Sequence, residues 1–152
     1  MDEKEKLTIR DSENAQKAIL SLVLQYPDFP GTFKADNTSV RWNRINDTTS
    51  IGIFPLQGAV YLKKYVSGSY AAQMPFQIVF RSSPTTNKAS IDAQTVLEEL
   101  GKWMENSGGI EFKDPRMQLE GISRTSNVFS FSQDEKHADY GINMQLKYFY
   151  KK

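Results

Sequence analysis

The sequence predicts an α+β fold in which a mostly antiparallel sheet is packed by two helices. Period-two alternation of apolar and polar residues, typical of strands, recurs between residues 39 and 80 and again after residue 109. Helical stripes occur in only two places, and they separate these runs of strands. The predicted order is therefore one helix, four strands, a second helix, and two or three strands, which differs from the strict strand–helix alternation of parallel folds.

The first helix is predicted to begin near Asp11, because Asp11 or Ser12 can accept hydrogen bonds from the first free amides as an N-cap. Residues 1–10 are expected to form a flexible leader, and residues 11–152 a single α+β domain. The turn sequence from Tyr26 to Gly31 ends the helix. Its apolar stripe consists of Ala15, Ala18, Ile19, Leu22 and Val23.

Four strands are predicted before the second helix, in residues 39–45, 49–54, 59–66 and 69–80. In the last of them Phe76, Ile78 and Phe80 alternate with polar or smaller side chains, as one face of a strand requires. Pro75 lacks an amide hydrogen, so we expect a strand start or a bulge there rather than a centrally paired strand.

The second helix is predicted to start at Ser90 as N-cap, with Asp92 in the first turn, and to end at the Asn106–Gly109 turn. Gly101 weakens a helix by about 1 kcal/mol relative to alanine, which suggests close packing at that point. The stripe that should cover the sheet consists of Ala93, Val96, Leu97, Leu100, Trp103 and Met104.

The last third of the chain returns to strands. A first stretch is interrupted at Asp114–Pro115, a second spans residues 127–133, and the final one is the most regular in the chain. Its alternation predicts a long strand with one buried and one wet face, typical of antiparallel sheets. The predicted buried residues are Tyr140, Ile142, Met144, Leu146, Tyr148 and Tyr150.

Composition excludes several functional classes. The 152 residues contain no cysteine, which removes disulfides, thiolate nucleophiles and cysteine-based metal sites. The formal net charge of +1 provides no strong field for nucleic acid or acidic membranes. No apolar run approaches the roughly 20 residues of a membrane span, and the amino terminus lacks the apolar core of a secretory signal.

Catalytic, cofactor-binding and metal-binding residues are not predicted. The one histidine, His137, lies in a charged turn, and neither Glu98–Glu99 nor Asp134–Glu135 has the spacing of a catalytic pair. No phosphate-binding loop or nucleophile elbow is present. We therefore expect a protein that is not an enzyme and needs no cofactor. A weaker alternative is a small-molecule enzyme with a pocket between the sheet and the helix that follows Ser90.

Aromatic and basic residues alternate along the predicted strands, and they form the one candidate interface. Such a pattern suits either a stacking surface for single-stranded nucleic acid or a protein–protein surface, and the low net charge favours the second. The edge strand around Tyr61–Val66 is a candidate for pairing with a neighbouring chain. The candidate interface residues are Arg41, Trp42, Tyr61, Lys63, Tyr65 and Tyr70.

The region from Tyr61 to Glu105 resembles the minor capsid or tail terminator family of tailed phages and prophages of Gram-positive bacteria. The shared features are an aromatic-Gly-Ser-Tyr turn, an apolar strand ending in a basic residue, an Ile-Asp-Ala helix start and a Leu-Gly-x-Trp helix end. They correspond to Tyr65, Gly68, Ser69, Tyr70, Phe76, Arg81, Ile91, Asp92, Ala93, Leu100, Gly101 and Trp103.

This resemblance implies a structural virion protein, either a tail terminator or a head–tail joining subunit. Such a subunit forms a ring, commonly a hexamer, that caps the tail tube and connects it to the head. The implied partners are copies of the chain, the major tail tube protein and the connector proteins of the neck, without a membrane. DNA would pass through without specific binding, in keeping with the near-neutral charge. The implied location is the virion, after assembly in the bacterial host cytoplasm.

Overall fold

The structure, a computed structural model, describes residues 3–26, 40–43, 45, 50–82, 87–107, 110–133 and 138–152. Within these residues two helices and seven strands follow one another as one helix, four strands, one helix and three strands, in agreement with the predicted order of one helix, four strands, a second helix and two or three strands. They are α1 (Glu3–Leu24), β1 (Val40–Trp42), β2 (Ser50–Pro55), β3 (Tyr61–Lys64), β4 (Tyr70–Ser82), α2 (Asn87–Asn106), β5 (Met117–Arg124), β6 (Phe129–Gln133) and β7 (Ala138–Tyr150).

Two long antiparallel strands, β4 and β7, form the centre of the sheet and pair along their whole length, from Tyr70 opposite Tyr150 to Ser82 opposite Ala138. Each outer edge of this pair receives two short strands. On β4 these are β3 at one end and β2 at the other, and on β7 they are β5 and β6. Every pairing is antiparallel except that of β1 with β2, so the predicted α+β class with a mostly antiparallel sheet is confirmed.

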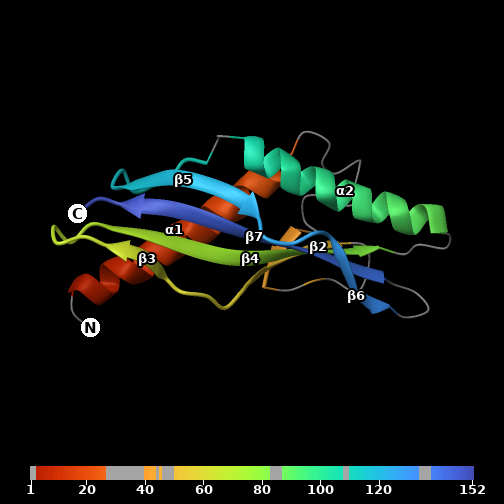
Figure 1. The fold of residues 1–152 in the computed structure, drawn as a ribbon, viewed down its shortest axis with the longest axis horizontal. Coiled ribbons are helices and arrows are strands. Elements are labelled where there is room, and N and C mark those ends of the chain that lie inside the picture. The colour runs from red at the N-terminus through yellow and green to blue at the C-terminus, as the bar shows by residue number, and fades with distance from the viewer. Residues whose placement is uncertain are drawn as a thin grey trace.

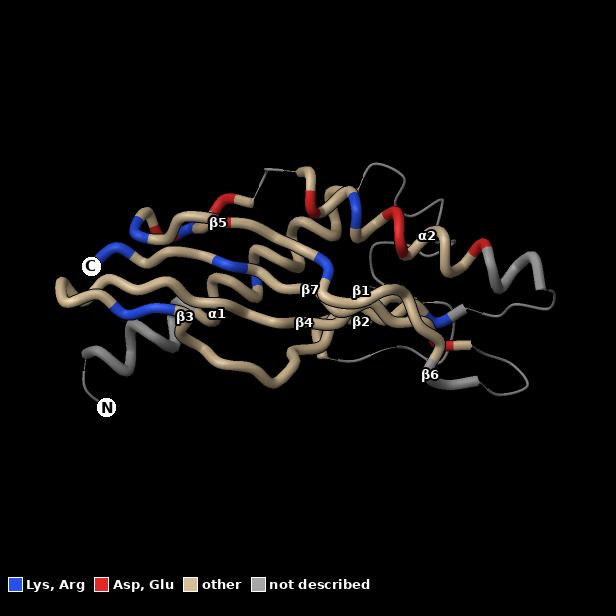
Figure 2. The backbone as a smooth tube through the Cα atoms, in the orientation of Figure 1, with Lys and Arg blue, Asp and Glu red and all other residues tan. Residues whose placement is uncertain are grey.

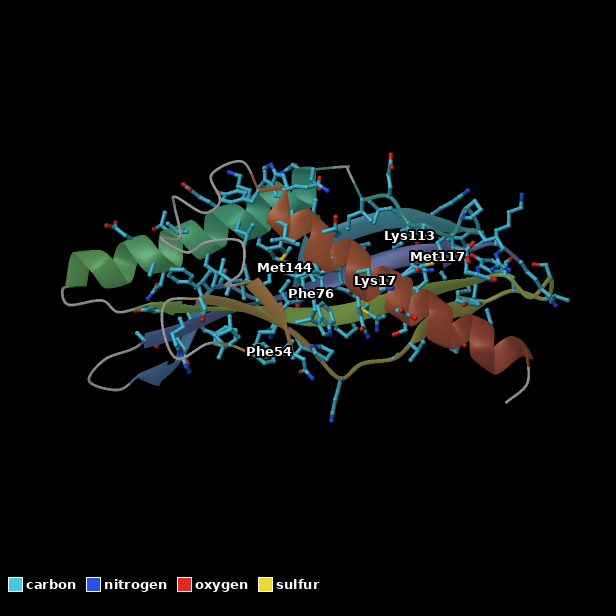
Figure 3. The ribbon with its side chains drawn as sticks, turned by 180° about the vertical axis from the view of Figure 1, so that it is seen from behind. Lys17, Phe54, Phe76, Lys113, Met117 and Met144 are labelled. Atoms are coloured by element: carbon cyan, nitrogen blue, oxygen red, sulfur yellow. The ribbon has the colours of Figure 1, made fainter. Side chains whose placement is uncertain are left out.

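Both helices pack on the same face of the sheet. Figure 1 is viewed from the opposite face, with α1 crossing behind the strands, and Figure 3 shows α1 in front. The core lies between this face and the helices, and it includes Phe76 of β4 and its register partner Met144 of β7. Tyr26, just after α1, meets Trp103 of α2 edge to face at 5.3 Å between ring centroids. No helix among the described residues is long and apolar enough to cross a membrane.

The predicted apolar stripes are confirmed. Each of the five predicted α1 residues is buried, and so is each of the six in β7. In α2 the stripe is buried except for Val96 and Trp103, which are partly buried against the core. Gly101 faces the sheet, where a Cβ atom would lie 3.0 Å from Ile142 Cδ1 and 3.1 Å from Arg124 Cδ. The close packing expected from this glycine is therefore present.

The starts of both helices differ from the predicted ones. Helix α1 begins at Glu3 instead of Asp11, so the residues expected to be a leader are helical from Glu3 onward. Helix α2 begins at Asn87, which places Ser90 inside the helix and Asp92 beyond the first turn. Local capping signals identified possible starts, but good helix formers upstream extend both helices past them.

The expectation of a strand start or bulge at Pro75 is wrong. Pro75 lies within the central strand β4 and pairs with Gln145 of β7. The proline is tolerated there because its backbone nitrogen and carbonyl point away from β7, toward the edge of β4 that pairs with β2. Pro75 lies just beyond the last pair between β2 and β4. On that edge the Pro75 carbonyl accepts a hydrogen bond from the Leu56 amide at 3.0 Å. The missing amide hydrogen therefore removes no bond from the β4–β7 ladder.

Candidate functional site

The candidate site is the β3 hairpin, residues 60–69, which projects at one end of the sheet (Figure 1). Its turn is closed by the Tyr65 amide bonding to the Ser69 carbonyl at 2.9 Å and the Gly68 amide bonding to the Tyr65 carbonyl at 3.0 Å. Gly68 has φ of 94°, a conformation that favours glycine. The end of β7 is tied to this turn, because the Lys152 amide donates to Ser69 Oγ at 3.1 Å.

Exposed apolar side chains gather on this hairpin. Among the described side chains five large hydrophobic residues are exposed, and four of them, Val60, Leu62, Tyr65 and Val66, belong to the hairpin. Val66 at the turn is completely exposed. Single exposed hydrophobic residues are normal, whereas a contiguous group marks an interaction surface.

Aromatic rings anchor the hairpin to the body of the sheet. Tyr70 stacks on Tyr150 with 5.0 Å between ring centroids, and Tyr61 meets Tyr70 edge to face, also at 5.0 Å. On the opposite face Tyr65 meets Phe149 of β7 at 5.9 Å. These contacts hold the base of the hairpin in place while its turn remains exposed.

Lysines make the same end of the molecule basic. Lys64 Nζ lies 4.3 Å from the centre of the Tyr61 ring, and Lys63 Nζ lies 5.1 Å from that of Tyr65. The segments 61–70 and 147–152 together contain five lysines and no acidic residue. Figure 2 shows this group at the end of the sheet where the hairpin and the last strand meet. This end of the molecule therefore carries a cluster of basic side chains.

The free edge of β3 is poorly suited to extending the sheet. Within the part of the chain that the structure describes, β3 pairs only with β4, and its register shifts between Tyr61 and Lys63. A bulge and flanking lysines are the features by which edge strands avoid indiscriminate pairing. The hairpin therefore offers side chains more readily than a long row of backbone hydrogen bonds.

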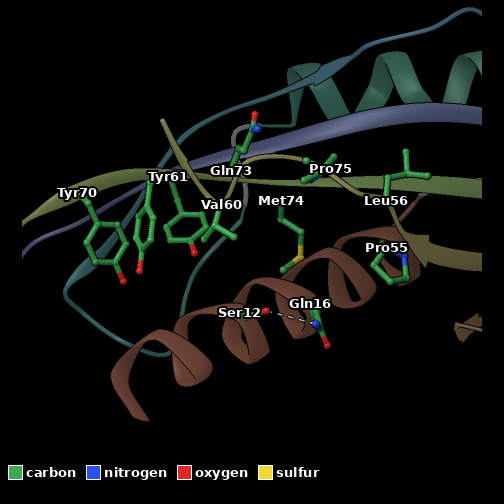
Figure 4. A pocket seen from close by; sticks show the side chains of 12 residues that line it. Ser12, Gln16, Pro55, Leu56, Val60, Tyr61, Tyr70, Gln73, Met74 and Pro75 are labelled. Carbon is green, nitrogen blue, oxygen red and sulfur yellow. Dashed lines mark hydrogen bonds between the residues drawn. The ribbon is translucent and has the colours of Figure 1, made fainter. Parts of the chain in front are cut away.

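A groove of about 360 Å³ separates the base of the hairpin from α1 (Figure 4). Its wall toward α1 carries Ser12 and Gln16, and Gln16 Nε2 donates to Ser12 Oγ at 3.4 Å. Its other wall is mainly apolar and includes Val60, Leu56 and Met74. Among the residues whose side chains the structure describes, no carboxylate or amine lines the groove, so this part of its surface suits apolar or neutral contacts.

The structure brings four of the six predicted interface residues together: Tyr61, Lys63, Tyr65 and Tyr70. Trp42 lies elsewhere, on β1 opposite Ile53 of β2, and is partly buried against the core. The Arg41 backbone belongs to β1, but its side chain falls outside the described residues. The role of all six as an interface stays a prediction.

Sequence reasoning missed three further features of this surface: the exposure of Val60 and Leu62, the position of Lys152 beside the turn, and the contact of Phe149 with Tyr65. The apolar residues beside lysines in the hairpin sequence could have indicated the first. The other two depend on the return of β7, at the end of the chain, to the start of β4.

The titratable residues considered above do not assemble into a site among the described residues. Glu98 and Glu99 are exposed on α2, and no three acidic or histidine side chains of the described residues lie together as metal ligands. His137 and the Asp134–Glu135 pair lie outside the described residues.

Comparison with known proteins gives likenesses of fold. No protein-family model matches the chain, and no curated protein matches it in sequence. A chain from the virion of a native gene transfer agent particle superposes with a TM-score of 0.53 at 9% identity, covering 78% of this chain and 89% of that one. A second solved protein, with no functional description, gives 0.56 at 11% identity and covers 93% of this chain and 96% of its own. At such identities the likeness shows a shared fold.

Proposed function

We propose that this chain is a structural virion assembly protein, a tail terminator or head–tail joining subunit. In this role it forms a ring that caps the tail tube and connects the tube to the head. The chain works by contact between folded surfaces, not by catalysis. Its partners are further copies of itself, in a ring of six, together with the major tail tube protein and the connector proteins of the neck.

The observation that carries this proposal is the concentration of exposed apolar and basic side chains on one hairpin, in a fold shared with a chain of a gene transfer agent virion. An assembly subunit needs such a surface, because its partners must replace the water that covers it. A ring requires two different contact surfaces on each subunit, and the hairpin would supply one of them.

The proposal is tested in particles made by the phage or prophage that encodes the chain. We expect the chain to co-purify with complete virions and to be labelled by antibody at the junction of head and tail. Deleting its gene should leave tails of uncontrolled length beside unattached heads. Complete particles of normal infectivity after deletion, with the chain absent from purified virions, would refute the proposal.

A single-stranded nucleic-acid-binding module remains the alternative, favoured by Lys63 and Lys64 beside two tyrosine rings and by Lys152 beside Gly68 at the turn. Against it, Lys64 already lies over the Tyr61 ring and Lys63 over that of Tyr65, so each of these rings has a face occupied by a lysine head. Titration of labelled single-stranded DNA at several salt concentrations separates the two functions. Tight binding with a steep salt dependence would favour the alternative.

A further inference from the structure

The end of the molecule that carries α2 has the features that would receive the β3 hairpin. Between α2 and the β5–β6 connection lies a hollow of about 200 Å³, whose lining includes the apolar side chains Val128 and Ile142. Thr95 and Glu98 of α2 form part of its rim. The hollow has room for one aliphatic side chain. Most of its lining is polar and includes both Arg124 and the carboxylate of Glu98, with Val128 and the buried Ile142 as the apolar part.

Acidic side chains dominate the solvent side of α2. The helix contains four acidic residues and two lysines. Of the four, Glu105 is occupied within the molecule, since it accepts hydrogen bonds from Arg124 Nε and, at 3.2 Å, from the Arg124 amide. Asp92 and Glu99 are exposed, as is Glu98, whose side chain is 64% accessible and lies 3.9 Å from Arg124. The acidic groups nearest the hollow therefore face solvent.

The two surfaces lie on different parts of one chain. Figure 2 shows the lysines of β3 and of the chain end at one extremity and the acidic residues of α2 toward the other. They are also opposite in shape, because Val66 projects from a turn while Val128 and Ile142 line a hollow. Surfaces that are complementary but different join subunits head to tail, the type of contact from which rings are built.

We propose that the β3 hairpin of one copy docks against the α2 hollow of the next copy. In this contact Val66 enters the hollow, and Lys63 and Lys64 approach the carboxylates of Glu98 and Glu99. The inference rests on the proposed function, which it deepens by naming the two surfaces that join neighbouring subunits. The occupant is a second copy because one chain carries both the basic projection and, beside the hollow, the exposed carboxylates of α2.

Charge reversal tests the contact. The tip variant K63E/K64E and the helix variant E98K/E99K each place like charges across the proposed interface. Like charges facing each other oppose binding strongly, so we expect the concentration needed for self-association to rise on the order of 10- to 100-fold for each variant. Sedimentation at low and high salt measures this change. Thermal melting of each variant shows whether the fold is intact, since all four positions are exposed.

Mixing the two variants distinguishes a head-to-tail contact from a symmetric one. Each variant keeps one unaltered surface, so the helix variant's hairpin can bind the tip variant's α2. The tip variant's acidic hairpin in turn faces the helix variant's basic α2, so both contacts of an alternating ring are complementary in charge. We expect equimolar mixtures to assemble beyond the dimer with the two variants alternating, although neither variant associates alone, whereas a symmetric hairpin-to-hairpin contact would stop at a dimer. The chain carrying all four changes should regain self-association, because both surfaces have exchanged charge.

The proposal is overturned if the variants associate as the unaltered chain does, if their mixture fails to associate or stops at a dimer, or if the unaltered chain stays monomeric both in solution and on tail tubes. Its failure differs from failure of the proposed function. If the charge-reversed chains still complete virions, the function stands and the contact is wrong. If the contact forms but virions never contain the chain, the function is wrong.

Discussion

The strands β3 and β5 lie on opposite edges of the same central pair, β4 and β7, yet they differ in almost every respect. Helix α2 packs along β5, and Met117 and Ile122 of that strand are buried. In β3 Tyr61 is partly buried and the three residues after it are exposed. Position at the edge of the sheet does not by itself make a strand available for contact. A strand is available only where no helix covers it, and in this chain α2 covers β5 while β3 stays uncovered.

The two edges also differ in how they are fastened. Arg124 of β5 is bound by Glu105 of α2 through its side chain and its amide, which links strand to helix. The charged side chains of β3 make cation–π contacts with tyrosines of their own hairpin. The covered edge therefore contributes to stability, whereas the free edge is available for binding. Leucine truncation and removal of polar contacts compare the two edges, whereas glycine substitution compares a close-packed and an open position of the covered edge.

The largest difference is expected for leucine truncation. Leu100 of α2 is fully buried, so Leu100→Ala should lower the free energy of unfolding by about 2–5 kcal/mol. Leu62 of β3 is 46% exposed, and Leu62→Ala should change it by less than about 0.5 kcal/mol. Urea denaturation followed by circular dichroism measures both values. Equal losses would show that the free edge is as important for folding as the covered one.

Glycine substitution gives the next largest effect. Gly101→Val should destabilise by about 1–3 kcal/mol, because added carbons meet Ile142 and Arg124 where α2 approaches the sheet. Gly121 of β5 has open space where a Cβ would be placed, so Gly121→Ala should be nearly neutral. The melting temperature of each variant checks the pair. A neutral Gly101→Val would mean that α2 does not pack closely on the sheet.

Removal of polar contacts should give the smallest difference. Glu105→Ala removes the acceptor for the half-buried Arg124, and we expect a loss of about 1 kcal/mol. Lys64→Ala removes an exposed cation–π contact and should lose no more than about 0.5–1 kcal/mol. If Lys64→Ala proved the more damaging in chemical denaturation, the assignment of stability to the covered edge would be wrong.

The spacing of apolar residues along the sequence predicts much of the fold, because the alternation in β7 and the stripes in α1 and α2 match the buried residues. Sequence reasoning failed where the outcome depends on neighbours. Pro75 is tolerated because the pairing of β2 with β4 stops one residue before it is reached. The residues around Pro75 do not reveal this register of β2 and β4. The candidate site was predicted in part for the same reason. Tyr61, Lys63 and Tyr65 are close in sequence, whereas Phe149 and Lys152 join them only through the long β4–β7 pairing.

The head-to-tail contact can be trapped directly, because the chain has no cysteine of its own. One chain carrying both Val66→Cys and Thr95→Cys places a thiol on the hairpin turn and another on the rim of the α2 hollow. A matched chain carrying Leu24→Cys in place of Thr95→Cys keeps the hairpin thiol but moves the second to another exposed position.

We predict that a short thiol cross-linker, applied to the doubly substituted chain in solution and in virions, gives a ladder of covalent multimers that ends at the ring size. The Leu24→Cys control should remain largely monomeric. A product that stops at the dimer, or no covalent product from chains shown to be assembled, would contradict the account.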